Sequence, residues 1–130
     1  MGRVENKIAL VTGAGSGLGR AISIMLAKEG AKVAVTDINE SSAQETAAMI
    51  GDQAISFQHD VTDEGRWQSV LQGTVDHFGG LNILVNNAGI GDGSDVESTD
   101  FETWKRVHAI DLDSVFLGCK YAIRHMEKTD

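Results

Sequence analysis

The fold is decided by the stretch Thr12-Gly13-Ala14-Gly15-Ser16-Gly17-Leu18-Gly19, which joins the apolar run 8–11 to a helix-forming segment. A buried strand that enters a glycine-rich turn and leaves it as a helix is the arrangement that a dinucleotide site requires. Gly13 permits the tight turn, Gly17 lets backbone approach a pyrophosphate, and Gly19 allows the helix to pack closely on the strand. The helix N-terminus then offers its free N–H groups to phosphates. A flexible connector is the alternative for a glycine-rich turn taken alone.

Apolar runs and helical patterns alternate along the whole chain. This alternation predicts an α/β fold with a doubly wound parallel sheet and helices on both faces. We expect residues 1–130 to be the N-terminal dinucleotide-binding part of one such domain, incomplete at its C-terminus because sheets of this type normally continue with more strands. The predicted strands are 7–12, 32–37, 54–58 and 81–85, and the predicted helices are 18–29, 39–50, 62–78 and a long one from 99 to about 126.

Several local features of the helices follow from residue spacing. Leu18, Ile22, Met25 and Leu26 form the apolar face that we expect the first helix to bury. Thr62 is the expected cap of the third helix. Thr99 and Glu102 have the spacing of a capping box at the start of the long helix.

Composition limits the classes of partner. The net charge of −8 disfavours nucleic acid and anionic membranes, and 42% hydrophobic with 23% charged residues is typical of soluble globular proteins. The single cysteine, Cys119, excludes an internal disulfide and indicates a reducing compartment, so we expect a cytoplasmic protein. Its apolar helix position predicts that Cys119 is buried. The four histidines lack the spacing of metal ligands, so no metal site is predicted.

Asp37 ends the second predicted strand, eighteen residues after Gly19. In a doubly wound sheet this position faces the adenosine ribose, where a carboxylate accepts hydrogen bonds from the two hydroxyls of NAD and repels the 2′-phosphate of NADP. The neighbouring Ile38 and Asn39 carry no positive charge for a phosphate. The sequence therefore favours NAD, and a solvated acid at a strand end is the alternative.

Two further motifs follow the third and fourth strands. Asp60-Val61 comes after the third strand, where an acid can reach the adenine amino group, although a turn former has the same spacing. Asn86-Asn87-Ala88-Gly89 comes after the fourth strand and is expected to border the same crevice as the glycine turn. Its Asn side chains can tie adjacent strand ends together, and its small residues leave room for a ribose. A simple turn is the alternative for this motif too.

Taken together, these motifs resemble the short-chain dehydrogenase/reductase family, of the compact NAD-dependent kind. The resemblance covers the whole chain and implies a Rossmann-like fold, an NAD(H)-dependent oxidoreductase acting on a secondary alcohol or ketone, and a homo-oligomer when complete. The site residues that it implies are Gly13, Ser16, Gly17, Leu18 and Gly19 for the pyrophosphate side, Asp37 for the ribose, Asp60 and Val61 for the adenine, and Asn87, Ala88 and Gly89 for the nicotinamide-side ribose.

The chain departs from the family where the chemistry lies. The family uses a Ser, a Tyr and a Lys, the last two as Y-x-x-x-K, and residues 1–130 hold no match. Tyr121 is the only tyrosine and is followed four residues later by His125, and Asp111 stands where the family has an Asn of the proton relay. We therefore expect no catalytic residue and no useful hydride transfer in this chain.

Two other classes of protein compete with a dehydrogenase. One is a non-catalytic NAD-binding module that senses the nucleotide or docks a partner. The other is a methyltransferase that uses S-adenosylmethionine, which also combines a glycine-rich turn with an acid after the second strand. The glycine spacing and the motif at 86–89 disfavour the methyltransferase.

Overall fold

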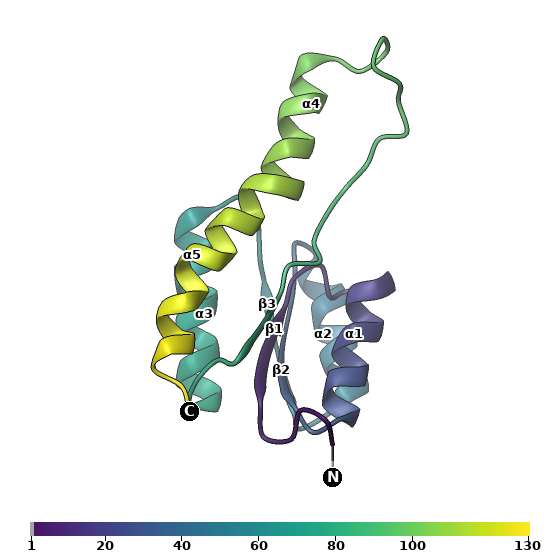
Figure 1. Cartoon of the computed structure of the whole chain (residues 1–130). Helices are drawn as coiled ribbons and strands as arrows, with labels where there is room; N and C mark the ends of the chain where they lie inside the picture. Colours follow the sequence, from purple (N-terminus) through teal and green to yellow (C-terminus); the bar gives the residue numbers. More distant parts are fainter. Residues whose placement is uncertain (1) are drawn as a thin grey trace.

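The computed structural model describes residues 2–130 and shows a four-stranded parallel sheet in the order β3-β2-β1-β4, with helices on both faces (Figure 1). This arrangement confirms the predicted doubly wound α/β fold. The elements are β1 (Ile8–Val11), α1 (Gly17–Lys28), β2 (Lys32–Asp37), α2 (Glu40–Ile50), β3 (Ala54–Gln58), α3 (Glu64–Phe78), β4 (Ile83–Val85), α4 (Phe101–His108), the π-helical turn η1 (Ala109–Asp113) and α5 (Ser114–Glu127).

The strand order reverses at β1. Leu10 pairs with Ala34 of β2 on one side and with Leu84 of β4 on the other. The chain therefore leaves β1 toward one side of the sheet and returns to β4 on the opposite side. In an open parallel sheet this reversal creates a crevice at the carboxyl ends of the strands, which is where ligands bind.

Each face of the sheet has its own apolar cluster. Helices α1 and α2 cover the face where Val11, Val33 and Val35 are fully buried, while α3 and α5 cover the other, around Leu10 and Trp67 (Figure 1). Alternate residues of a strand point to opposite faces, so these neighbouring strand residues serve different clusters. Burial on both faces explains why β1 is apolar at every position rather than alternating.

The long C-terminal helix is confirmed, with one addition. Helices α4 and α5 are continuous through η1, where one turn is wound as a π-helix. Figure 1 shows α4 and the segment before it projecting beyond the end of the sheet, while α5 runs beside α3. Within residues 2–130, the helices lack the length and apolarity needed to cross a bilayer.

The prediction that Leu18 and Met25 lie on the buried face of α1 was wrong, since they are 76% and 57% exposed. The buried residues of the helix are the small Gly19, Ser23 and Ala27. The prediction holds for Ile22 and Leu26, which are partly buried and pack against the cluster on this face of the sheet.

The predicted caps and the burial of Cys119 also need correction. Asp63, rather than Thr62, caps α3 through the N–H of Arg66, because Thr62 is already held by Asp60. The predicted capping box of Thr99 and Glu102 is absent at the start of α4. Asp100 is the N-cap there and accepts from the N–H of Thr103, while the Thr99 hydroxyl donates to the carbonyl of Asp95. Cys119 is exposed rather than buried, and its Sγ accepts a weak hydrogen bond from the Nδ2 of Asn86 at 3.7 Å.

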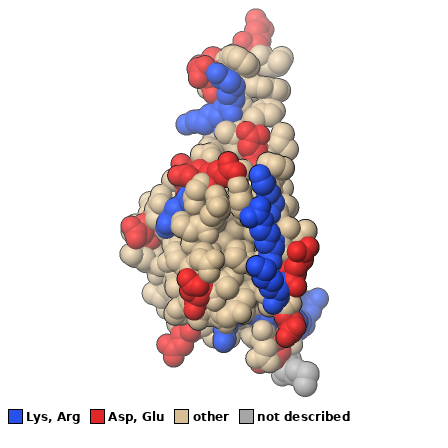
Figure 2. Space-filling model, turned by 90° about the vertical axis from the view of Figure 1, so that its left-hand side faces the viewer, with Lys and Arg blue, Asp and Glu red and all other residues tan. Residues whose placement is uncertain are grey.

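The surface that includes α5 carries both basic and acidic side chains. Figure 2 shows a line of basic side chains with acidic ones around it. Exposed Lys120 and Arg124 of α5 and its C-cap residue Lys128 repeat at four-residue spacing. The Lys120 ammonium lies 3.9 Å from the Glu64 carboxylate. The basic line is therefore short and partly neutralised.

Candidate functional site

A cleft of about 640 Å³ opens at the carboxyl ends of the strands. All but two of the predicted cofactor-binding residues line it, the exceptions being Gly17 and Gly19. The predicted residues in its wall are Gly13, Ser16, Leu18, Asp37, Asp60, Val61, Asn87, Ala88 and Gly89. The lining is completed by residues that were not predicted as site residues: Ile38, His59, Thr62, Ile90, Arg106, Ala109 and Ile110.

The glycine turn forms a cradle that side chains would fill. A Cβ on Gly13, whose φ is +60°, would lie 2.9 Å from the Cα of Ala88, and one on Gly19 would lie 2.2 Å from the Gly13 carbonyl oxygen. Gly17 is different: it has a φ of +54° but open space around it. Gly13 and Gly19 are thus needed for close packing, and Gly17 for backbone conformation beside an open cleft.

Helix α1 begins at this cleft with its backbone donors free. Within residues 2–130, Ser16 makes no capping hydrogen bond through its side chain and the first turn of α1 holds no acid. The N-caps Asn39, Asp63 and Asp100, by contrast, all accept from a backbone N–H. The first N–H groups of a helix lack intrahelical acceptors, so the start of α1 presents positive dipole and unused donors to the cleft. This donor set suits a phosphate group.

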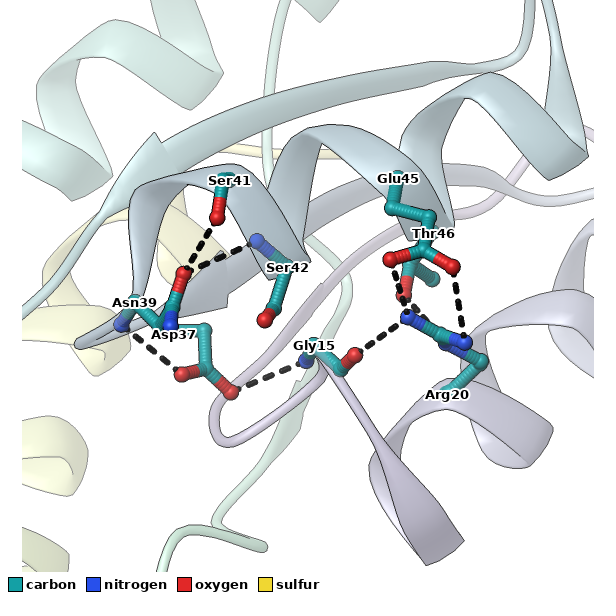
Figure 3. Close-up of polar contacts among 8 residues, drawn as sticks. All are labelled: Gly15, Arg20, Asp37, Asn39, Ser41, Ser42, Glu45 and Thr46. Atoms are coloured by element: carbon teal, nitrogen blue, oxygen red, sulfur yellow. Dashed lines mark hydrogen bonds and ion pairs between the residues drawn. The ribbon is translucent and has the colours of Figure 1, made fainter.

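The carboxylate of Asp37 lies beside the glycine turn. Its Oδ2 accepts from the N–H of Gly15 at 2.9 Å, and its Oδ1 accepts from the N–H of Asn39 at 2.9 Å (Figure 3). Both oxygens are therefore oriented by backbone, and each keeps a further lone pair for a hydroxyl donor. The acid is held in one orientation rather than freely solvated.

Thr12, for which no role in the site was predicted, joins the two glycine-containing loops. Its Oγ1 accepts from the N–H groups of Asn87 (3.0 Å) and Ala88 (2.9 Å). The Nδ2 of Asn87 in return donates to the carbonyls of Thr12 (3.1 Å) and Gly13 (3.2 Å). The expected tie between adjacent strand ends is thus present. Thr12 could have been singled out as a buried hydroxyl placed between an apolar strand and a turn.

Asp60 and His59 line the cleft after β3. The Oδ1 of Asp60 accepts from the N–H and hydroxyl of Thr62, so this acid also forms the turn that was the alternative interpretation. His59 is 1% exposed and its ring stacks edge-on against Trp67. Burial, with a smaller contribution from the charge of Arg66, lowers the pKa of His59 to about 4, so the ring is neutral at pH 7.

The opposite wall of the cleft comes from the long helix. The π-helical turn carries Asp111, whose Oδ1 accepts from the N–H of Ile90 at 2.8 Å. This bond fastens the loop after β4 to the helix. Tyr121 lies outside the cleft lining, is 9% exposed, and donates its hydroxyl hydrogen to Glu64, which is consistent with a packing role. Across residues 2–130, no group of three His, Cys, Asp or Glu side chains has the arrangement of a metal site.

The parallel sheet, its helices and the cleft at the carboxyl ends of the strands define a Rossmann-like fold. A family model described as short chain dehydrogenase matches residues 7–130, and the chain belongs to this family of oxidoreductases. It is 42% identical to 3-beta-hydroxysteroid dehydrogenase of Comamonas testosteroni over 127 residues, which cover 98% of this chain and 50% of that protein.

Two other relatives bear on the cofactor. The chain is 38% identical to an NADP-dependent (R)-specific alcohol dehydrogenase of Lentilactobacillus kefiri, covering 96% of this chain and 50% of that one. A crystal structure of 3-ketoacyl-(acyl-carrier-protein) reductase from Brucella melitensis complexed with NADH superimposes with a TM-score of 0.93 at 35% identity, over 96% of this chain and 52% of that chain. The chain thus spans about half the length of the relatives that it matches.

Proposed function

We propose that residues 1–130 form the N-terminal dinucleotide-binding part of an NAD(H)-dependent oxidoreductase that acts on a secondary alcohol or its ketone. The observation that carries the proposal is the Asp37 carboxylate, held by two backbone N–H groups beside the glycine turn. Relatives named as hydroxysteroid and alcohol dehydrogenases support the substrate class. When bound, NAD supplies the hydride acceptor for alcohol oxidation.

The residues of the glycine turn hold the pyrophosphate side in this proposal. The uncapped start of α1 directs the N–H groups of Ser16, Gly17, Leu18 and Gly19 toward the phosphates. Gly13 lets the loop after β4 approach the turn without a clashing side chain. The binding energy here comes from backbone donors, so it depends on the shape of the turn more than on any one side chain.

The two ends of the dinucleotide have separate partners. Asp60 offers its second oxygen to the adenine amino group, with Val61 beside it, since Thr62 occupies the first oxygen. Asn87, Ala88 and Gly89 border the nicotinamide-side ribose, where the bonds to Thr12 keep their backbone in place.

The charge of Asp37 favours NAD over NADP, because a negatively charged 2′-phosphate on the adenosine ribose would be repelled by a carboxylate that binds this ribose. Arg20, the cation beside the turn, is engaged by Gly15, Thr46 and Glu45. The Ser, Tyr and Lys that the family uses for proton transfer have no match in residues 1–130, so we expect no alcohol oxidation by this chain alone.

Self-association and location complete the proposal. Exposed Leu112, Phe116 and Ile123, on η1 and α5, are 60%, 64% and 55% accessible and support a homo-oligomer in which this helix is covered. The free thiol of Cys119 supports a reducing, cytoplasmic location. The net charge of −8 supports a partner other than nucleic acid or an anionic membrane.

The test is calorimetric titration of the chain with NAD, NADP and S-adenosylmethionine, together with Asp37→Asn. This variant keeps the size of the side chain and removes its charge. A charge-assisted hydrogen bond contributes about 1.5–3 kcal/mol, so the Kd for NAD should rise by roughly 10- to 100-fold, and the preference over NADP should shrink.

Asp52→Asn is the matched control, because Asp52 is an exposed acid in the turn before β3, at the other end of the sheet. It should leave the affinity unchanged. A folded chain that binds S-adenosylmethionine more tightly than NAD, or that binds no dinucleotide, would refute the proposal.

A further inference from the structure

Gly15, in the middle of the glycine turn, is held by side chains at both of its backbone polar groups. Its N–H donates to the Oδ2 of Asp37 at 2.9 Å, and its carbonyl oxygen accepts from the Nη2 of Arg20 at 2.6 Å (Figure 3). Gly15 therefore links an acid at the end of β2 to a cation in the first turns of α1.

Arg20 is itself fixed by helix α2. Its Nε donates to the Oγ1 of Thr46 at 2.9 Å, and Thr46 is completely buried. Its Nη2 also lies 3.5 Å from the Glu45 carboxylate, and the Arg20 side chain is only 25% exposed. A planar guanidinium with donors in fixed directions can hold these partners at once, whereas a lysine ammonium at the end of a flexible chain cannot. The position of the Gly15 carbonyl is thus set by α2.

Gly15 is tightly packed, so its backbone has no room to move without displacing its neighbours. A Cβ at this position would lie 2.7 Å from the Cβ of Ser42 and 2.9 Å from the Cγ of Asp37, so the backbone of the turn is in close contact with both. Asp37 has its second oxygen on the N–H of Asn39, which leads into α2. A displacement of Gly15 would therefore rotate the Asp37 carboxylate about its remaining bond to Asn39.

We propose that Arg20 is a positioning residue of the cleft, which acts through Gly15 to keep the Asp37 carboxylate oriented toward the adenosine ribose. Arg20 itself does not touch the dinucleotide. This inference rests on the proposed function and adds to it a residue that sets the discrimination between a free 2′-hydroxyl and a 2′-phosphate. When Arg20 is lost, Asp37 keeps its charge but loses its fixed direction.

The experiment compares Arg20→Gln, Arg20→Lys and the unchanged chain by calorimetry with NAD, AMP, NADP and nicotinamide mononucleotide. For Arg20→Gln, the Kd values for NAD and AMP, which contain the free adenosine ribose, should rise by roughly tenfold, the effect of misaligning one charge-assisted hydrogen bond. The Kd values for NADP and the mononucleotide should change by less than about threefold on the same argument. Arg20→Lys should restore part of the affinity for NAD, because it keeps a single donor.

Two further variants keep the test decisive. Glu45→Gln removes the outer, exposed ion pair and leaves the contact to Gly15, so it should alter the affinities by less than about twofold. Thr46→Val removes the buried anchor of Arg20 while Arg20 remains. It should reproduce the Arg20→Gln pattern in weaker form, even if Arg20→Gln does not fold.

The outcomes separate the inference from the proposed function. Equal losses for NAD and NADP in Arg20→Gln and Thr46→Val would show that Arg20 is merely structural and would overturn the inference, as would unchanged affinities. An unchanged chain that binds neither NAD nor AMP would overturn the proposed function, and the inference with it. A selective loss for NAD and AMP supports both.

Discussion

Thr12→Val tests how the two loops of the cleft are held together. The substitution keeps the shape of a side chain that is 1% exposed and removes the hydroxyl that accepts from the N–H groups of Asn87 and Ala88. The N–H of Asn87 retains a second acceptor, the Val85 carbonyl at 3.1 Å, whereas the Thr12 hydroxyl is the acceptor of the Ala88 N–H within residues 2–130. One donor is therefore orphaned and one weakened.

An unsatisfied buried donor costs about 1–3 kcal/mol, and these hydrogen bonds are only partly buried, so Thr12→Val should lower the free energy of unfolding by about 1–2 kcal/mol. With a denaturant slope of about 2 kcal/mol per M, the midpoint of urea unfolding should fall by about 0.5–1 M. The slope itself should stay unchanged, because the surface exposed on unfolding is the same. Circular dichroism in a urea series measures both quantities.

Thr74→Val is the matched control. Thr74 is fully buried, but its hydroxyl donates to the Val70 carbonyl of its own helix and holds no N–H of another element. This substitution should cost less than about 1 kcal/mol, since the carbonyl keeps its helical bond. Thr12→Ser should stay near the unchanged chain. Equal midpoints for Thr12→Val and Thr74→Val would refute the idea that Thr12 fastens the loops.

Three other results are expected. The pKa of His59 is about 4 in the folded chain against an ordinary value of 6.5, so the unfolded state binds more protons between these two pH values. The contribution of His59 to the free energy of unfolding should be fully present above pH 6.5 and fall by about 3 kcal/mol as the pH drops to 4. His59→Gln should flatten this pH dependence, measured as the midpoint of urea unfolding. Gly19→Ala should lower the free energy of unfolding by about 1–3 kcal/mol, because its Cβ would overlap the Gly13 carbonyl, whereas Gly91→Ala, in open space, should be neutral in thermal melts. Gly17→Ala should lower the free energy of unfolding by only about 1 kcal/mol, because of the positive φ at this position, and should leave the chain folded. A rise in the Kd for NAD of this folded variant, measured by calorimetry, would identify a role of Gly17 at the phosphates.

Much of the fold was predictable because local spacing carries it. The strands 32–37 and 54–58 were predicted with their observed bounds. The errors lie where two local signals compete. Thr62 is a residue type that commonly caps helices, but its hydroxyl donates to Asp60 instead. Leu18 is apolar but exposed, and the buried residues of α1 are smaller ones that allow closer packing. The residue types alone do not decide which of two neighbouring residues caps a helix or is buried.

The candidate site was predictable only in part. The glycine turn and Asp37 have a signal in their order along the chain, since both stand at the ends of apolar runs. His59 has the same signal, since it follows β3 directly and precedes Asp60, and it could have been found in this way. Arg106 lies inside α4 and has no such signal, so only the packing of the long helix shows that it reaches the cleft.

The sequence by itself determined the succession of strands and helices, the glycine turn after the first strand and the acid after the second. Only the tertiary structure decided which of these residues touch: Thr12 holds Asn87 across 75 positions, and Arg20 reaches Gly15 from a site fixed by Thr46. The physical reason is that secondary structure depends on the period of apolar residues along a few turns, which the chain displays locally. Contacts across the cleft depend on which strand ends become neighbours in the sheet, and that is settled by the packing of the whole domain.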